Sequence, residues 1–241
     1  MRHNYALIIP ALNEAESIGI VLQRIPRRLF SQIIVVDNGS HDQTPEVAAA
    51  AGAKVVRESR RGYGQACLSG IRHVENQVTA IAFMDADLAD EPEDLARLVR
   101  HLDEGEWDMV LGSRVLGNPE PGSLTPLQRF GNWLSTRLIA MVWHFRFTDI
   151  GPMRIVRRDS LARLNMRDRT FGWTVEMQAR AAQLGLRVSE LPVRYRRRLH
   201  GRSKISGTLF GSVRAGVKIL WTILLCCLLP LRTSSHRIGK T

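Results

Sequence analysis

Two aspartates separated by one residue, Asp85 and Asp87, end an apolar run that begins at Ala80. Where a buried strand ends, both carboxylates can turn into one loop and reach a common cation. Carboxylate oxygens suit Mg²⁺ and Mn²⁺, which commonly bridge a protein carboxylate and the phosphates of a substrate. The alternative is a solvated turn at the head of a helix, with Asp90 or Glu91 near the N-cap.

A second polar loop, Asp37–Thr44, follows another strand-like run. Gly39 permits a tight turn, and Asp42 or Thr44 can cap the helix that comes next. Asp37 stands at the strand end, where it can accept hydrogen bonds from a base or a ribose. An ordinary strand-to-helix loop is the competing interpretation.

The segment Arg60–Ala66 places two arginines and two glycines before a helix. Backbone N–H groups at the start of a helix favour phosphate, so this segment is a candidate phosphate site. Taken alone, the pattern fits a flexible loop that leads into a helix better than it fits a phosphate site.

These loops need a scaffold that brings them together, and the first half of the chain alternates strand-like and helix-like segments. We expect strands at Tyr5–Pro10, Ile33–Asp37, Lys54–Arg57, Ala80–Asp85 and Asp108–Gly112. Helical patterns occupy Glu14–Leu29, Thr44–Ala51, Gly64–Val74 and Glu93–Asp103. The alternation predicts an α/β fold with a mainly parallel central sheet flanked by helices. Ligands bind outside the carboxyl ends of such strands, so we expect the site at that edge.

The second half of the chain is less regular. Helical patterns cover Leu124–Trp143 and Thr174–Leu184, and a strand is expected at Val188–Tyr195 before the basic stretch Arg194–Lys204. On a strand, alternate residues face opposite sides, so Arg194, Arg196 and Arg198 share one face and Arg197 takes the other. Both a solvated basic strand and a ligand-binding segment stay open.

The apolar run Leu209–Leu231 has an uncharged core, Ile219–Leu231, of 13 residues. Spanning a bilayer takes about 20 residues. Arg214 and Lys218 are four apart and share a face on a helix. We therefore favour an interfacial membrane helix over a buried or oligomer-forming one, and both over a spanning helix.

The net charge of +11 is concentrated at the C-terminus, where Glu190–Thr241 holds 11 basic residues and one acidic residue. This predicts an anionic partner for the tail: lipid headgroups, a phosphorylated substrate or nucleic acid. Three cysteines make no disulfide framework, and the sequence shows no secretory signal. We expect a cytoplasmic protein, peripheral on the inner face of the cell membrane.

The polar motifs come in a fixed order at the spacing of strand–helix units: Pro10–Glu14, Asp37–Thr44, Gly62–Gly64, Asp85–Asp87, Gly112–Arg114, Thr148–Arg154 and Arg198–Lys204. In this order the chain resembles glycosyltransferase family 2, in the branch of dolichyl-phosphate mannose synthase and related polyprenyl-phosphate glycosyltransferases. The resemblance covers about residues 5–205. It implies a GT-A catalytic domain over residues 1–205, followed by a basic and apolar C-terminal helix and tail over 206–241.

The resemblance also implies roles for individual residues. A nucleotide-sugar donor, UDP- or GDP-linked, would lie against Pro10, Ala11, Asn13, Glu14, Asp37, Gly64, Asp85 and Ala86. Mg²⁺ or Mn²⁺ would be held by Asp87 with Asp85. A lipid-phosphate or other lipid acceptor would be bound by Arg154, Arg198, Arg202, Ser203 and Lys204. The catalytic set would be Asp149, Arg114 and Arg129.

The implied reaction is a single in-line displacement with inversion at the anomeric carbon. An alcohol acceptor needs a general base, for which Asp149 is the candidate, although it can equally be a helix or turn cap. A lipid phosphate is already an anion and needs no base, and the cationic tail favours that version. Two positions depart from the family: Ala89 stands where the branch often has Gln, and Met153 where it has an aromatic residue. With Ala89 in place of Gln, one metal ligand is lost or is replaced by Asp90 or water, so the coordination of the metal stays open.

Two other classes compete with an enzyme. A nucleic-acid-binding protein would explain the charge, but not the acidic loops at successive strand ends, which repel phosphate unless a metal intervenes. A catalytically silent membrane-associated scaffold would keep the fold and the tail. The exposed apolar C-terminal run is also compatible with a homodimer.

Overall fold

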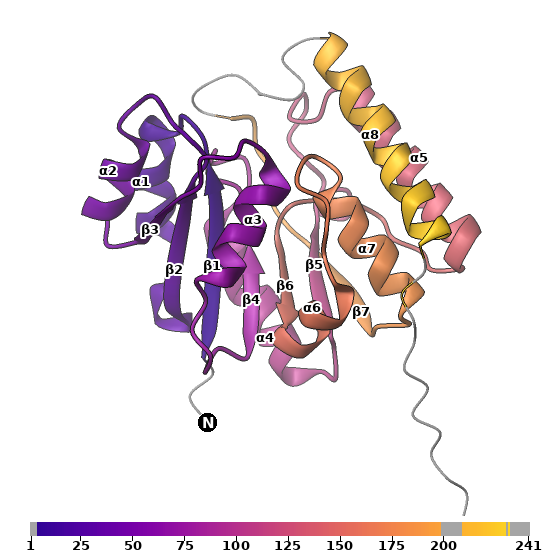
Figure 1. Cartoon of the computed structure of the whole chain (residues 1–241), viewed down its shortest axis with the longest axis horizontal. Coiled ribbons are helices and arrows are strands. Elements are labelled where there is room, and N and C mark those ends of the chain that lie inside the picture. Colours follow the sequence, from indigo (N-terminus) through magenta and orange to yellow (C-terminus); the bar gives the residue numbers. More distant parts are fainter. Residues whose placement is uncertain (1–3, 199–208, 230, 232–241) are drawn as a thin grey trace, which may run out of the picture.

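The computed structural model describes residues 4–198, 209–229 and 231, and these contain one seven-stranded sheet in the order β3-β2-β1-β4-β6-β5-β7 (Figure 1). Its strands are β1 (Tyr5–Ala11), β2 (Phe30–Asp37), β3 (Lys54–Arg57), β4 (Ala80–Phe83), β5 (Met109–Ser113), β6 (Arg154–Arg157) and β7 (Val188–Pro192). Neighbouring strands are parallel, except that β6 runs antiparallel between β4 and β5. The expected mainly parallel α/β fold is confirmed.

Helices cover both faces of the sheet, because successive side chains of its buried strands point to opposite sides. On β1, Leu7 and Ile9 belong to one buried cluster, and Ala6 and Ile8 belong to the other. The first cluster is closed by α1 (Ala15–Arg24), α2 (Thr44–Ala50) and α4 (Leu95–Glu104). The second is closed by α3 (Tyr63–Arg72), α6 (Arg158–Leu164) and α7 (Trp173–Gln183).

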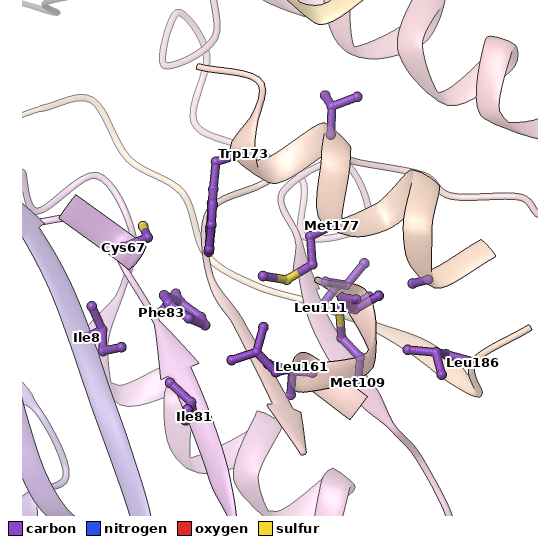
Figure 2. Close-up of a cluster of buried hydrophobic side chains, with 14 of the residues drawn as sticks. Ile8, Cys67, Ile81, Phe83, Met109, Leu111, Leu161, Trp173, Met177 and Leu186 are labelled. Atoms are coloured by element: carbon purple, nitrogen blue, oxygen red, sulfur yellow. The ribbon is translucent and has the colours of Figure 1, made fainter. Parts of the chain in front are cut away.

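The second cluster fixes the strand end from which the Asp85–Asp87 loop emerges (Figure 2). Phe83 is the last residue of β4, and its ring meets the ring of Trp173 edge-on, with 6.0 Å between the centroids. Edge-to-face packing of this kind is favoured between aromatic rings. Trp173 begins α7, so the contact ties the end of β4 to that helix.

Some element boundaries differ from those expected. The helix predicted over Glu14–Leu29 stops at Arg24, because Pro26 forces Ile25 into an extended conformation, with ψ 134°. A 3₁₀ turn follows at Arg27–Leu29. The antiparallel β6 was not predicted, since it is four residues long and begins and ends with arginine.

Two long helices lie side by side at one end of the sheet (Figure 1). The first, α5 (Pro126–Trp143), opens with a capping box in which Thr125 and Gln128 exchange hydrogen bonds. The second, α8 (Leu209–Leu228), packs on α5 and α7, and its Ile223 and Cys226 enter the buried cluster. In the described ranges, no helix combines the length and the apolar character needed to cross a bilayer.

Candidate active site

A pocket of about 420 Å³ opens at the carboxyl ends of β1, β2 and β4, the edge at which the sequence places a site. This volume suits a small-molecule ligand. The lining comes from the loops after these strands, from the start of α3 and from two segments further along the chain: Pro10, Ala11, Leu12, Glu14, Asn38, Arg61, Gly62, Tyr63, Ala66, Asp85, Ala86, Asp87, Thr170, Phe171 and Arg198.

Two loops on the β1–β2 side of the pocket are tied to each other by hydrogen bonds. Asn13 accepts a hydrogen bond from the N–H of His41 and donates its own N–H to the hydroxyl of Ser40. The carboxylate of Asp37 accepts the N–H of Ser40 at 2.9 Å. Asn13 and Asp37, both expected in the donor pocket, therefore shape its rim, and neither is among the lining residues.

Asn38 joins the pocket floor to the loop before α3. Its amide nitrogen donates to the carbonyls of Glu58 and Arg60, and its amide oxygen accepts the N–H of Gly62 at 2.7 Å. Asn38 is buried, with 5% of its surface exposed. Because all three bonds go to backbone groups, this one residue fixes the path of the Glu58–Gly62 loop across the pocket.

The start of α3 is not the open phosphate cradle that its glycines suggest. The N–H of Gly64 donates to the carbonyl of Thr170, and the N–H of Gln65 donates to the carbonyl of Arg169. These two amides are already used, and Gly64 is absent from the pocket lining. The glycines serve another purpose. A Cβ at Gly62 would lie 2.1 Å from the Arg169 carbonyl, and one at Gly64 would lie 2.2 Å from the Asp168 carbonyl.

Asp85 and Asp87 face the pocket together, as their spacing predicts. Asp87 Oδ1 accepts the N–H of Ala89, and Asp87 Oδ2 forms an ion pair with Arg198 Nη2 at 2.7 Å. Burial and the neighbouring Asp87 raise the pKa of Asp85 to about 6, against the opposing effects of Tyr63 and two arginines. Two carboxylates this close repel each other when both are ionised, and a bound cation would relieve that repulsion.

The donor chemistry of this loop fits Mg²⁺ or Mn²⁺. Among the described residues, Asp85 Oδ1 is shielded from solvent and accepts no hydrogen bond, so it has a free coordinating position. Over the same residues, no cluster of three or more His, Cys, Asp or Glu side chains is arranged to hold a metal alone. A site with one or two carboxylates, completed by water and substrate phosphate, is the usual arrangement for Mg²⁺.

Three arginines of the basic run form a ladder with the acidic segment that follows Asp85. Arg194 pairs with Asp94 at 3.3 Å, Arg196 with Glu91 at 2.8 Å, and Arg198 with Asp87 at 2.7 Å. Arg197 turns away and donates to the carbonyl of Pro121. This is the alternation expected of a strand. The shared face pairs with carboxylates, although the side chains of Arg194 and Arg196 stay more than half exposed and that of Arg198 is 30% exposed.

Arg114 and Asp149 form a second charged group near the two aspartates. Arg114 Nε and Nη2 each lie 2.8 Å from a carboxylate oxygen of Asp149, which also accepts the N–H groups of Arg114 and Ile150. Burial opposes ionisation, but Arg114 outweighs it and lowers the pKa of Asp149. A saturated carboxylate of low pKa is a weak base. The geometry favours a positioning role, in which Asp149 holds Arg114 over the Tyr195 ring, 5.0 Å from its centroid.

Two other expected site residues lie away from the pocket. Arg154 is fully buried and donates to the carbonyls of Gly151, Pro152 and Thr174, so it cannot contact an acceptor, and that expectation is corrected. Arg129 is exposed on α5 and is not a lining residue. Arg202, Ser203 and Lys204 lie outside the described residues.

The pocket is also lined by residues to which the sequence motifs assign no individual role. Thr170 and Phe171 form a wall contributed from beyond β6, and their segment carries no motif that links it to the first half of the chain. Arg61 and Tyr63 belong to the glycine-containing segment before α3. The composition of that segment does not show whether its side chains or its backbone groups line the pocket. Only the folded arrangement identifies these positions.

Comparison with known proteins gives concordant results. The family model described as Glycosyl transferase family 2 matches residues 6–164. An uncharacterised glycosyltransferase of Mycobacterium bovis is 39% identical over 225 residues, which cover 90% of this chain and 96% of that protein. An undecaprenyl-phosphate mannosyltransferase of Micrococcus luteus is 29% identical over 222 residues, covering 87% of this chain and 90% of that protein.

The fold has a clear counterpart among solved structures. The crystal structure of glucosyl-3-phosphoglycerate synthase from Mycobacterium tuberculosis, in complex with Mn²⁺, UDP and glucosyl-3-phosphoglycerate, matches with a TM-score of 0.76. The match covers 95% of this chain and 81% of that one, at 22% identity. At this identity the likeness supports the shared fold.

Proposed function

Because the chain belongs to glycosyl transferase family 2 and is a glycosyltransferase, we propose that it moves a sugar from a nucleoside diphosphate sugar to a lipid phosphate, with inversion at the anomeric carbon. The observation that carries the proposal is the placement of Asp85 and Asp87 on the wall of the pocket at the ends of β1, β2 and β4. A charged diphosphate needs a cationic partner there, and these carboxylates can hold one.

The donor would occupy the 420 Å³ pocket. Its nucleoside would lie over Pro10, Ala11 and Leu12, where apolar surface and backbone groups are available, with Asn38 holding the opposite loop. Its diphosphate would lie between the two aspartates and the basic side chains of Arg61 and Arg198. Arginine suits this position because its planar guanidinium can donate two hydrogen bonds to one phosphate group.

Asp87, with Asp85, would hold Mg²⁺ or Mn²⁺ against the donor. When bound, the metal supplies positive charge that stabilises the departing nucleoside diphosphate. The chain's own part is to hold the two carboxylates close together, and the low polarity around them strengthens their attraction for a cation. The solved structure with the same fold contains Mn²⁺ and UDP, which supports this assignment.

In the proposed reaction an acceptor oxygen forms a bond to the anomeric carbon while the bond from that carbon to the diphosphate oxygen breaks. A phosphate acceptor brings a nucleophilic oxygen without a proton to remove. This agrees with the saturated carboxylate of Asp149, which has little capacity to accept one. The lipid-phosphate acceptor is further supported by the Micrococcus luteus relative, which is an undecaprenyl-phosphate mannosyltransferase.

A lipid acceptor requires access to a membrane, and α5 and α8 present a surface suited to one. Large apolar side chains stand exposed on the neighbouring helices: Phe130, Trp133, Met141 and Val142 on α5, and Val217, Leu220, Trp221, Leu224 and Leu228 on α8. We call these residues the α5/α8 apolar face. In the sequence, the basic stretch Arg194–Lys204 comes shortly before α8. Basic residues next to an apolar helix are expected where the helix lies in an anionic membrane interface.

The experiment that tests this function incubates the protein with labelled UDP- and GDP-sugars, Mn²⁺ and either a polyprenyl phosphate or 3-phosphoglycerate. Label transfer to the polyprenyl phosphate supports the proposal. Transfer to the soluble phosphate alone contradicts the lipid acceptor, and no transfer from any donor contradicts the proposed reaction.

A further inference from the structure

We propose that Lys218 and Thr222 of α8 act as positioning residues for the donor pocket, by holding Asp168 and through it the loop Asp168–Phe171. The inference rests on the proposed function, because it assigns a donor to the pocket that this loop closes. It links the C-terminal helix, which lies outside the pocket lining, to the affinity for the nucleotide.

The link begins at a buried carboxylate. Lys218 Nζ lies 2.7 Å from Asp168 Oδ2, and the hydroxyl of Thr222 lies 3.3 Å from the same oxygen and 2.8 Å from the Lys218 carbonyl, between which it shares its one proton. The Asp168 side chain is 5% exposed, whereas that of Lys218 is 32% exposed. Lys218 and Thr222 are one helical turn apart, so both reach Asp168 from the same face of α8.

The other oxygen of the same carboxylate holds the pocket wall. Asp168 Oδ1 accepts the N–H of Thr170 at 2.7 Å and its hydroxyl at 3.1 Å. Thr170 and Phe171 line the pocket. One carboxylate therefore bridges α8 on one side and the donor-facing turn on the other.

The backbone of this loop is also seated against α3, which forms the adjoining wall. The carbonyls of Arg169 and Thr170 accept the N–H groups of Gln65 and Gly64. The fit is tight enough that only glycine leaves room at Gly62 and Gly64, as the close approach of the Asp168 and Arg169 carbonyls shows. A shift of the loop would therefore move the α3 wall, which includes Tyr63 and Ala66.

Packing at Gly172 supports the same coupling. A Cβ at this position would lie 2.3 Å from the Thr222 hydroxyl and 2.5 Å from Asp168 Oδ2. Gly172 precedes α7, so α8, the Asp168 carboxylate and the start of α7 meet without intervening space. Close-packed contacts of this kind transmit a displacement rather than absorb it.

A second anchor keeps the loop folded when the α8 contact is removed. The Glu176 carboxylate accepts the N–H groups of Arg167 and Asp168 and pairs with Arg180 at 2.8 Å. This anchor lies within the catalytic domain and does not involve α8. Loss of Lys218 should therefore loosen the turn at Thr170 and Phe171 without unfolding the domain.

The test compares the binding of UDP and GDP, each with Mn²⁺, by calorimetry for the full chain and for Lys218→Met, Lys218→Arg and Thr222→Val. Lys54→Met is the matched control, because Lys54 is an exposed lysine on β3. Among the described residues, its ammonium group donates only to the carbonyl of His73. For Lys218→Met we expect about tenfold weaker nucleotide binding. We expect a smaller loss for Thr222→Val, near-recovery with Lys218→Arg, and no change in the control.

Amide hydrogen exchange separates positioning from general destabilisation. In Lys218→Met, the Thr170 and Phe171 amides should exchange faster while the core strand β1 keeps its protection. Nucleotide affinity equal to that of Lys54→Met would overturn the inference, as would uniform loss of protection across the domain. If the unaltered protein binds neither nucleotide, the proposed function fails and the inference fails with it. Normal binding in the unaltered protein and in Lys218→Met overturns the inference alone.

Discussion

The guanidinium of Arg198 lies 2.7 Å from the Asp87 carboxylate, so a cation of the chain itself sits where the proposed metal would bind. Burial alone would lower the pKa of Arg198, but Asp87 and Asp85 outweigh it and raise that pKa, so the side chain keeps its charge. Arg198 ends the ladder of ion pairs and also lines the donor pocket. Arrival of metal and diphosphate would let Arg198 exchange the carboxylate for phosphate.

This relationship predicts opposite effects of Arg198→Ala on two ligands. Without nucleotide, Mn²⁺ should bind several-fold more tightly, because a competing cation is gone. With Mn²⁺ present, the nucleotide should bind about tenfold more weakly, because one charge-assisted contact to the diphosphate is lost. Spin-resonance titration of Mn²⁺ and calorimetry of the nucleotide measure the two effects. Equal weakening of both ligands would show that Arg198 does not compete for Asp87. Arg197→Ala is the matched control, since Arg197 points the other way.

Asp149→Asn should lower stability, because it leaves the largely buried Arg114, 13% exposed, without the charge of its partner. Removing one member of a buried ion pair costs roughly 3–5 kcal/mol. Denaturant unfolding at pH 7 measures this cost, and Asp159→Asn, at an exposed carboxylate of α6, is the control. A cost below that of the control variant would mean that the pair does not hold Arg114.

The same pair predicts how stability depends on pH. The folded-state pKa of Asp149 is lowered, so its stabilisation is fully present above the unfolded pKa and is lost as the pH falls through the folded value. The stability gap between the unaltered protein and Asp149→Asn should therefore narrow below about pH 4. A constant gap between pH 6 and pH 3 would contradict the lowered pKa.

Gly64→Ala should destabilise the protein by about 1–3 kcal/mol, because its Cβ would lie 2.2 Å from the Asp168 carbonyl. Gly131→Ala is the matched control. It lies within α5 with no atom within 4 Å of the added Cβ, so better helix propensity should make it neutral or stabilising by up to about 1 kcal/mol. Chemical denaturation compares the two, and equal stability would show that the loop can shift away from α3.

The α5/α8 apolar face predicts membrane binding. Trp133→Glu and Trp221→Glu should each reduce sedimentation with anionic phospholipid vesicles severalfold, since both residues are more than half exposed on this face. Ile20→Glu is the control, because Ile20 is an exposed apolar residue of α1. This helix lies at the opposite end of the sheet from α5 and α8 (Figure 1). If the tryptophan variants bind vesicles normally but lose a concentration-dependent dimer, the face is an interface between two copies instead.

Local patterns predicted the parts of the site that depend on neighbouring residues. The spacing of Asp85 and Asp87 at a strand end predicted their shared orientation, and strand alternation predicted that Arg197 would face away from Arg196 and Arg198. Both predictions rest on the alternation of side chains along a strand and on the position of polar residues at its end, which a few neighbouring residues are enough to show. The same reasoning identified the α/β fold, because each strand–helix unit is visible by itself.

The missing parts depend on contacts between distant segments. No local signal shows that the Gly64 N–H is used by Thr170, that Arg154 is buried among backbone carbonyls, or that Lys218 reaches Asp168. In each case a polar group that looks available for a ligand is satisfied by a part of the chain brought in by the fold. The type of residue indicates which bonds it can make, and only the tertiary structure shows which partner is present.

The most direct test of the account is nucleotide binding to the unaltered protein and to Asp87→Asn, measured by calorimetry with UDP and GDP, with and without Mn²⁺. Asp87→Asn keeps the size of the side chain and removes the charge that would hold the metal. We predict that Mn²⁺ tightens binding of one nucleotide to the unaltered protein by about a hundredfold, and that Asp87→Asn loses most of this gain while binding without metal is little changed. Nucleotide binding that ignores Mn²⁺, or a full Mn²⁺ effect in Asp87→Asn, would contradict the account.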